Sequence, residues 1–185
     1  MTELNPEGIW ELKDISALAR LPCLKELVLS NTKVQDISKL DGLENLQVLW
    51  LSNTKVKDVT ALASLRNLQA LWLSYTEVQD VSSLARLTNL HVLWLNNTKV
   101  KAVSKLDGLT NLQVLRMNHT EVEDVTALAG LTNLRTLWLS GTKVQDVTEL
   151  AGLKNLQELH LHNTQVNDVS ALNGIPNLRI FRQKF

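Results

Sequence analysis

Residues 68–89 read LQALWLSYTEVQDVSSLARLTN, and a 22-residue pattern of this kind recurs along most of the chain. Its first leucine returns without insertion at Leu24, Leu46, Leu68, Leu90, Leu112, Leu134, Leu156 and Leu178. Two more leucines follow in the order L-x-x-L-x-L, and in the complete copies only Met117 departs from leucine, with a side chain that fills similar space. Self-similarity at this period predicts a solenoid of stacked units.

The spacing of apolar residues divides each unit into two halves. The last two leucines lie two residues apart, which predicts a short strand with both side chains on one side and the intervening residue on the other. In the later half, as at Val56, Val59, Leu62 and Leu65, the spacing of three favours a 3₁₀ or short helical turn. One unit cannot bury both halves, so we expect units to stack, with parallel strands about 4.8 Å apart on the concave side and turns on the convex side.

The unit of residues 68–89 resembles the 22-residue leucine-rich repeats of bacterial internalins and of the leucine-rich regulatory subunit of protein phosphatase 1. The resemblance covers most of the chain and implies an α/β repeat solenoid, a right-handed horseshoe with a concave parallel sheet. Because members bind unrelated partners, it predicts the fold and not the ligand. A threonine stands where internalins usually carry an asparagine, a variant similar to that of other bacterial repeat proteins, so the resemblance suggests a bacterial source.

The two ends of the chain are expected to close the solenoid. Residues 1–11 predict an N-terminal cap, with Ile9 and Trp10 covering the first coil and Trp10 as its anchor. Residues 12–177 carry the repeats. Residues 178–185 predict a partial last repeat or C-terminal cap, in which Leu178 and Phe181 begin an eighth strand. The alternative is that the solenoid continues in a longer parent protein.

Three polar columns repeat with the leucines, and we interpret all three as structural. The threonines should lie inside the coil and bond the backbone, the asparagines should close the loop entering each strand, and the aspartates should cap the 3₁₀ turns. Ala102 interrupts the aspartate column. The columns are Thr32, Thr54, Thr76, Thr98, Thr120, Thr142, Thr164; Asn45, Asn67, Asn89, Asn111, Asn133, Asn155, Asn177; and Asp36, Asp58, Asp80, Asp124, Asp146, Asp168.

Composition argues against several classes of partner. The 19 basic and 19 acidic residues balance to a net charge of zero, which disfavours binding to nucleic acid or to an anionic membrane. No apolar run is long enough to span a membrane, and residues 1–10 lack the layout of a signal peptide. We therefore expect a cytoplasmic location, with a secreted or injected effector as the open alternative. The single Cys23 agrees with a reducing compartment.

Catalysis and cofactor binding have no support in the pattern. The histidines His91, His119, His160 and His162 are scattered, and no nucleophile has a recognisable base beside it. His160 and His162 lie on one side of a predicted strand, but no third residue at ligand spacing accompanies them. We expect no enzyme activity, no metal and no cofactor.

The outward-facing strand positions carry the candidate binding site. The position between the second and third leucines holds four of the five tryptophans, which packing of the core does not require. Beside them, valines form an apolar strip, and aromatic or imidazole side chains follow the strands. The candidate partner-binding residues are Trp50, Trp72, Trp94, Arg116, Trp138, His160, Val48, Val92, Val114, Tyr75 and His119.

This surface favours a scaffold that binds a protein or peptide, because it is larger than the apolar patches that monomers ordinarily expose. Arg116 interrupts the tryptophans and is the predicted specificity residue: its stem should pack between Trp94 and Trp138 while its head pairs with a partner carboxylate. The alternative for Arg116 is an intramolecular cation–π contact that only keeps the column soluble. Three alternatives stay open. The column could bind carbohydrate, it could mediate self-association as a homodimer, or its stacking could serve only to support the sheet.

Overall fold

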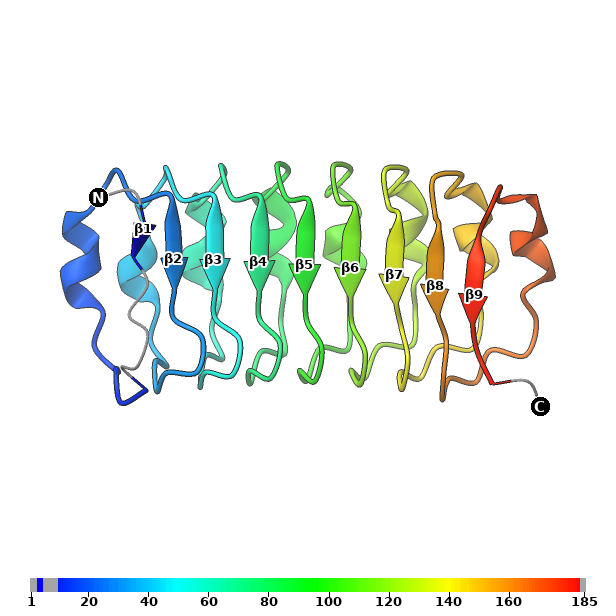
Figure 1. The fold of residues 1–185 in the computed structure, drawn as a ribbon, viewed down its shortest axis with the longest axis horizontal. Helices are drawn as coiled ribbons and strands as arrows, with labels where there is room; N and C mark the ends of the chain where they lie inside the picture. Colours follow the sequence, from blue (N-terminus) through cyan, green and yellow to red (C-terminus); the bar gives the residue numbers. More distant parts are fainter. Residues whose placement is uncertain (1–2, 5–9, 184–185) are drawn as a thin grey trace.

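The computed structural model describes residues 3–4 and 10–183 and shows one sheet of parallel strands arranged in sequence order (Figure 1). Each strand pairs with the next one along the chain, and the repeat register places Leu49 beside Leu71 and Trp50 beside Trp72. The strands are β1 (Glu3–Leu4), β2 (Glu26–Val28), β3 (Val48–Trp50), β4 (Ala70–Trp72), β5 (Val92–Trp94), β6 (Val114–Arg116), β7 (Thr136–Trp138), β8 (Glu158–His160) and β9 (Arg179–Phe181).

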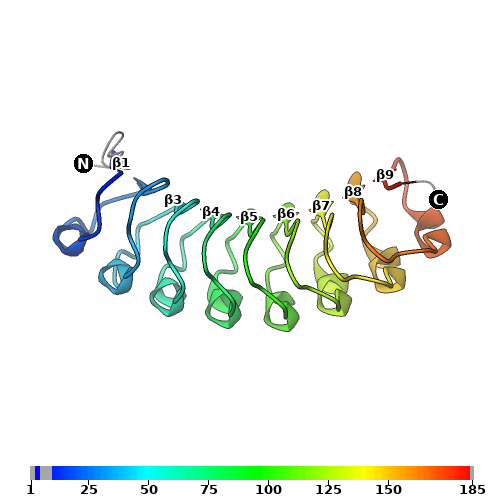
Figure 2. The ribbon, with the colours of Figure 1, turned by 90° about the horizontal axis from the view of Figure 1, so that it is seen from below.

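A 3₁₀ turn lies between each strand and the next. The strands line the concave side of an arc and the turns its convex side (Figure 2). The turns are η1 (Ser16–Arg20), η2 (Ser38–Leu40), η3 (Thr60–Ser64), η4 (Ser82–Arg86), η5 (Ser104–Leu106), η6 (Thr126–Gly130), η7 (Thr148–Gly152) and η8 (Ser170–Gly174). No helix within the described ranges has both the length and the apolar character that crossing a membrane requires.

The leucines of the pattern form one continuous core between the sheet and the turns. Leu68, Leu71 and Leu73 are fully buried, and Met117 is as buried as the leucines whose place it takes. The valines of the convex half close the core from the other side, as Val78 and Val81 do. The leucine-rich-repeat solenoid with concave strands and convex 3₁₀ turns is therefore confirmed.

The threonine column lies inside the coil, as predicted. The hydroxyl of Thr98 donates a hydrogen bond of 2.7 Å to the carbonyl of Leu95, three residues earlier. The same bond recurs in the other coils, including the partly buried Thr164. Each threonine thus satisfies a carbonyl of its own coil.

The asparagine column ties neighbouring coils together. The side-chain amide of Asn89 donates to the carbonyl of Arg66 in the preceding coil, at 2.9 Å. Five other asparagines make the equivalent bond: Asn45, Asn67, Asn111, Asn133 and Asn155. These six asparagines are structural, as predicted, although their bond reaches across coils and not only around their own loop. Asn177, the seventh, makes no such bond among the described residues and adopts a left-handed φ of 58°.

The aspartate column caps the turns. A carboxylate oxygen of Asp80 accepts the backbone N–H of Ser82 at 2.8 Å, and this bond lowers the pKa of Asp80. Asp14, which the sequence analysis did not include, makes the same contact with Ser16. At the interruption, the backbone after Ala102 already has the capped shape: Val103 has φ −121° and ψ 13°, against −113° and 14° for Val81.

The last strand departs from the 22-residue register. Leu159 of β8 pairs with Ile180 and His160 pairs with Phe181, so this coil is one residue shorter than the others. The coil is shortened between η8 and β9, a segment in which Asn177 adopts a left-handed φ of 58°. Leu178 packs against the core, as a leucine position should, but the prediction for Phe181 is wrong: Ile180 takes the inward position, and Phe181 takes the outward one.

The N-terminal end differs from the predicted cap in one respect. Strand β1 pairs with β2 and extends the sheet beyond the first repeat. Trp10, however, is 63% exposed, with the ammonium of Lys33 5.3 Å from its ring centre, so it is not a buried anchor. Ile9 lies outside the described residues, as does Lys184 at the other end.

Candidate binding surface

One column of planar side chains runs across the concave sheet from β3 to β9. Register pairing places each member beside the next because equivalent positions of parallel strands stand side by side. The column consists of Trp50, Trp72, Trp94, Arg116, Trp138, His160 and Phe181. The structure thus brings together all six predicted column residues and adds Phe181, which the register shift carries into line.

The rings of the column contact one another in sequence. Trp50 and Trp72 stack with centroids 3.7 Å apart and planes 7° from parallel, whereas Trp72 and Trp94 meet edge to face at 6.0 Å. At the other end, His160 lies 4.5 Å from Trp138 and stacks on Phe181 at 4.3 Å. At least one face of each tryptophan is therefore directed at a neighbour in the column.

The guanidinium of Arg116 lies between two indoles. Its Cζ atom is 4.3 Å from the ring centre of Trp94 and 3.8 Å from that of Trp138. The charged head itself lies between the rings, where only the aliphatic stem was predicted to lie. Partial burial lowers the pKa of Arg116, and the charge of Glu158 opposes this shift. Within the described residues, Arg116 takes part in no ion pair.

The indole N–H groups of the column point away from solvent. The Nε1 atoms of Trp50, Trp72, Trp94 and Trp138 are enclosed and have no hydrogen-bond partner among the described residues. An enclosed donor without an acceptor costs free energy, which the ring contacts of the column must offset. A partner can therefore contact the ring edges and the apolar surface of the column, but not the indole N–H groups.

Apolar side chains flank the column in its central part. Val48, Val92 and Val114 occupy the other outward position of β3, β5 and β6, and each is half-buried. At the C-terminal end this position is charged: Glu158 of β8 forms an ion pair with Arg179 of β9 and lies 3.9 Å from His160. The predicted apolar strip is present, and its C-terminal end is charged.

Tyr75 and His119 occupy a special backbone position just beyond the strands. Equivalent residues in seven coils have positive φ, and the other five are asparagine or glycine, which tolerate it best. Tyr75 has φ 60° and is 63% exposed. The ring of His119 lies over Gly141, where any Cβ would collide with it. An exposed tyrosine held in a disfavoured conformation is a candidate for a functional role.

Several polar residues at the edge of the face are engaged with the backbone. Asn96 accepts the N–H of Asn118 at 3.0 Å, and Asn118 accepts that of Ser140 at 2.9 Å. These side chains continue the strand pairing and are not free for a ligand. Metal binding has no cluster to support it: no three histidine, cysteine, aspartate or glutamate side chains converge within the described part of the chain.

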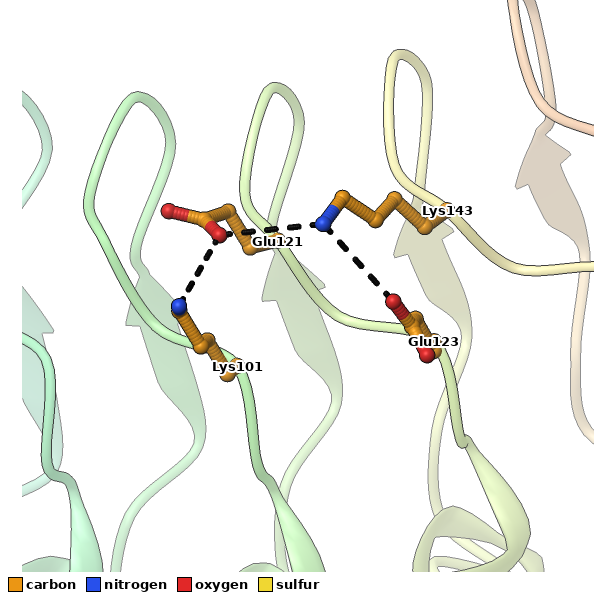
Figure 3. A network of polar contacts seen from close by, with 4 residues as sticks. All are labelled: Lys101, Glu121, Glu123 and Lys143. Carbon is orange, nitrogen blue, oxygen red and sulfur yellow. Dashed lines mark ion pairs between the residues drawn. The ribbon is translucent and has the colours of Figure 1, made fainter.

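Charged residues on the loops that leave the strands pair with one another. Lys101, Glu121, Lys143 and Glu123 form a chain of ion pairs across three coils, with separations of 3.2, 3.7 and 3.7 Å (Figure 3). The bond from Lys101 lowers the pKa of Glu121. The charges of these four side chains therefore compensate one another.

Comparison with known proteins places the chain in a family. The model described as Leucine Rich repeats (2 copies) matches residues 24–67, 44–86, 66–109 and 110–152. The crystal structure of internalin C2 from Listeria monocytogenes is 36% identical, with a TM-score of 0.95 over 98% of this chain and 80% of that one. The chain belongs to the internalin-like leucine-rich repeat family. No curated protein gives a significant sequence match.

Other solved structures agree with the internalin-like assignment. An internalin, inlF, from Listeria monocytogenes is 28% identical, with a TM-score of 0.84 over 94% of this chain and 59% of that one. The plant peptide hormone receptor RGFR1, solved in complex with RGF2, is 22% identical, with a TM-score of 0.79 over 91% of this chain and 29% of that one. The last likeness shows the fold alone. The Listeria structures support the bacterial source that the resemblance suggested.

Proposed function

We propose that this internalin-like chain is a non-catalytic scaffold that binds a protein or peptide along its concave column. The observation that carries the proposal is the column itself, seven planar side chains on the sheet face opposite the leucine core. Tryptophan and arginine are the residues in which binding energy concentrates at interfaces. Leucine-rich repeats of this family are typically protein-binding scaffolds.

Stacking within the column supports the sheet as well. Cross-strand pairs of this kind contribute about 0.2 to 1 kcal/mol each. This contribution accompanies binding, because rings held by their neighbours lose little conformational entropy when a partner arrives. The structural role and the binding role therefore use the same contacts.

Carbohydrate binding is the weaker candidate on this geometry. A sugar ring stacks on an open indole face, but Trp50 and Trp72 cover each other, and Arg116 covers a face of both Trp94 and Trp138. The indole N–H groups that would bond sugar hydroxyls are enclosed. Peptide side chains can use ring edges and apolar flanks without either feature.

A selection from random peptides tests the proposal. The immobilised chain is incubated with a dodecapeptide display library. Glycan binding is measured on an array, and the oligomeric state is measured by light scattering at several concentrations. The test variant is Trp72→Ala with Trp94→Ala. The control is Trp10→Ala, because Trp10 is an exposed tryptophan outside the column.

We expect selected peptides to bind the wild type and Trp10→Ala equally and to bind the double variant at least tenfold more weakly. Equal binding to the double variant would move the interface off the concave face. Glycan binding that the double variant loses would favour the carbohydrate alternative. A dimer that the double variant loses would favour self-association instead.

A further inference from the structure

The outward positions of the sheet are not uniform in charge. From β3 to β5 they hold only apolar residues: Val48, Trp50, Ala70, Trp72, Val92 and Trp94. From β6 to β9 they hold four ionisable side chains, of which Glu158 and Arg179 form an ion pair. Arg116 therefore carries a permanent charge that takes part in no ion pair within the described residues.

The environment of Arg116 restricts how an anion can reach it. Both faces of the guanidinium are covered by Trp94 and Trp138, and its Nε atom is enclosed without a partner. The N–H donors of a guanidinium lie in its plane, so an acceptor must approach edge-on, toward the terminal nitrogens. A carboxylate matches this edge with two parallel hydrogen bonds.

We propose that the partner segment carries an acidic residue, aspartate or glutamate, which pairs edge-on with Arg116 while apolar residues of the same segment lie over β3 to β5. The inference rests on the proposed function and names the chemistry of its ligand. Charge complementarity favours an acidic partner, because the guanidinium lies between two indoles without an ion pair and an anion is the group that interacts with it most favourably.

Strand spacing sets the distance between the two parts of the segment. Trp72 and Arg116 are two strands apart, which is about 9 to 10 Å. A peptide in the polyproline II conformation advances about 3.1 Å per residue and turns every third side chain to the same side. The apolar residue over Trp72 and the acidic residue at Arg116 are therefore about three positions apart in the partner. A random arrangement of the same residues would not satisfy both contacts.

The peptides selected on the wild-type chain provide the probe. We expect aspartate or glutamate to be enriched, with an aromatic or aliphatic residue about three positions away. The affinity of one such peptide and of its Glu→Gln or Asp→Asn form is then measured by fluorescence anisotropy against the wild type, Arg116→Gln and Arg116→Lys. Arg86→Gln is the control, because Arg86 is an exposed arginine at the end of η4 on the convex side.

The four combinations of peptide and chain form a double-mutant cycle. Removing either charge should weaken binding at least tenfold, and removing both should cost no more than removing one. Arg116→Lys should recover part of the loss, and Arg86→Gln should bind as the wild type does. Equal affinity of the neutral peptide for wild type and Arg116→Gln shows that the surface has survived the substitution.

Independent, additive losses in the cycle would overturn the inference, as would selected peptides without acidic enrichment. If those peptides still lose affinity in the Trp72→Ala and Trp94→Ala variant, the concave binding surface stands and only the acidic partner is wrong. If no selected peptide depends on these tryptophans, the proposed function itself fails.

Discussion

Replacing Thr98 by valine tests the internal hydroxyl column. Thr98 is 5% exposed, and its hydroxyl is the donor at 2.7 Å to the carbonyl of Leu95, for which no backbone donor is present among the described residues. Valine keeps the shape but leaves that carbonyl enclosed and unpaired, which costs about 1 to 3 kcal/mol. Burial of the added methyl group returns part of this, about 0.8 kcal/mol at most. We therefore expect a net destabilisation of about 0.2 to 2 kcal/mol.

Urea and thermal unfolding measure the effect of Thr98→Val. For a chain of this size, 1 kcal/mol corresponds to a fall of roughly 2 to 4 °C in the melting temperature. Thr98→Ser is the matched control, because it keeps the hydroxyl and loses only the methyl group. If Thr98→Val is as stable as the wild type, or more stable, the bond to Leu95 contributes nothing to folding and the reasoning is refuted.

Three other predictions follow from single positions. Ala102→Asp should raise the urea midpoint at neutral pH, because Val103 already has the capped geometry. Capping lowers the pKa of the equivalent Asp80, so the gain in stability should vanish as the pH falls through that lowered pKa. A gain that persists in strong acid would contradict capping. Tyr75→Asn should stabilise the chain by about 1 kcal/mol in thermal melts, because asparagine tolerates φ 60°; a loss of stability would mean that Tyr75 is not strained. His160 should titrate below the ordinary histidine range in NMR, because burial lowers its pKa and outweighs the opposing effect of the Glu158 charge. The free energy of unfolding should therefore fall as the pH drops below the pKa of an unfolded histidine, about 6.5. A normal or raised pKa would contradict the burial of His160.

The repeat made most of the fold predictable from the sequence. Strands β2 to β8 and the 3₁₀ turns follow from leucine and valine spacing, because every coil must bury the same positions against its neighbours. The same logic placed six members of the column on one face. Periodicity is a strong signal here because the same apolar spacing recurs in every coil and supports the same assignment each time.

The last strand shows where periodicity misled. Leu178 lies 22 residues after Leu156, so the pattern seemed intact, yet strand pairing places Ile180 and not Phe181 beside Leu159. The register of that strand depends on backbone conformation around Asn177 and on which side chains pack best, and neither is visible in the spacing of leucines. A β-branched residue beside the predicted position, Ile180, was the one signal for the shift.

Side-chain arrangement within the column was also beyond sequence reasoning. The sequence places Arg116 between two tryptophans, but whether its stem or its head lies there depends on rotamers and on the room left by the edge-to-face step from Trp72 to Trp94. Trp10 shares the repeat phase of the buried threonines, yet it lies exposed.

The indole N–H signals of the five tryptophans test the central claim most directly. In a ¹⁵N-labelled sample each indole gives one resonance, and substitutions such as Trp10→Ala and Trp72→Ala assign them. Addition of a selected peptide should shift the resonances of Trp50, Trp72, Trp94 and Trp138 and leave that of Trp10 in place, because Trp10 lies outside the column. A peptide that binds while the four column resonances stay unchanged would contradict binding on the concave face.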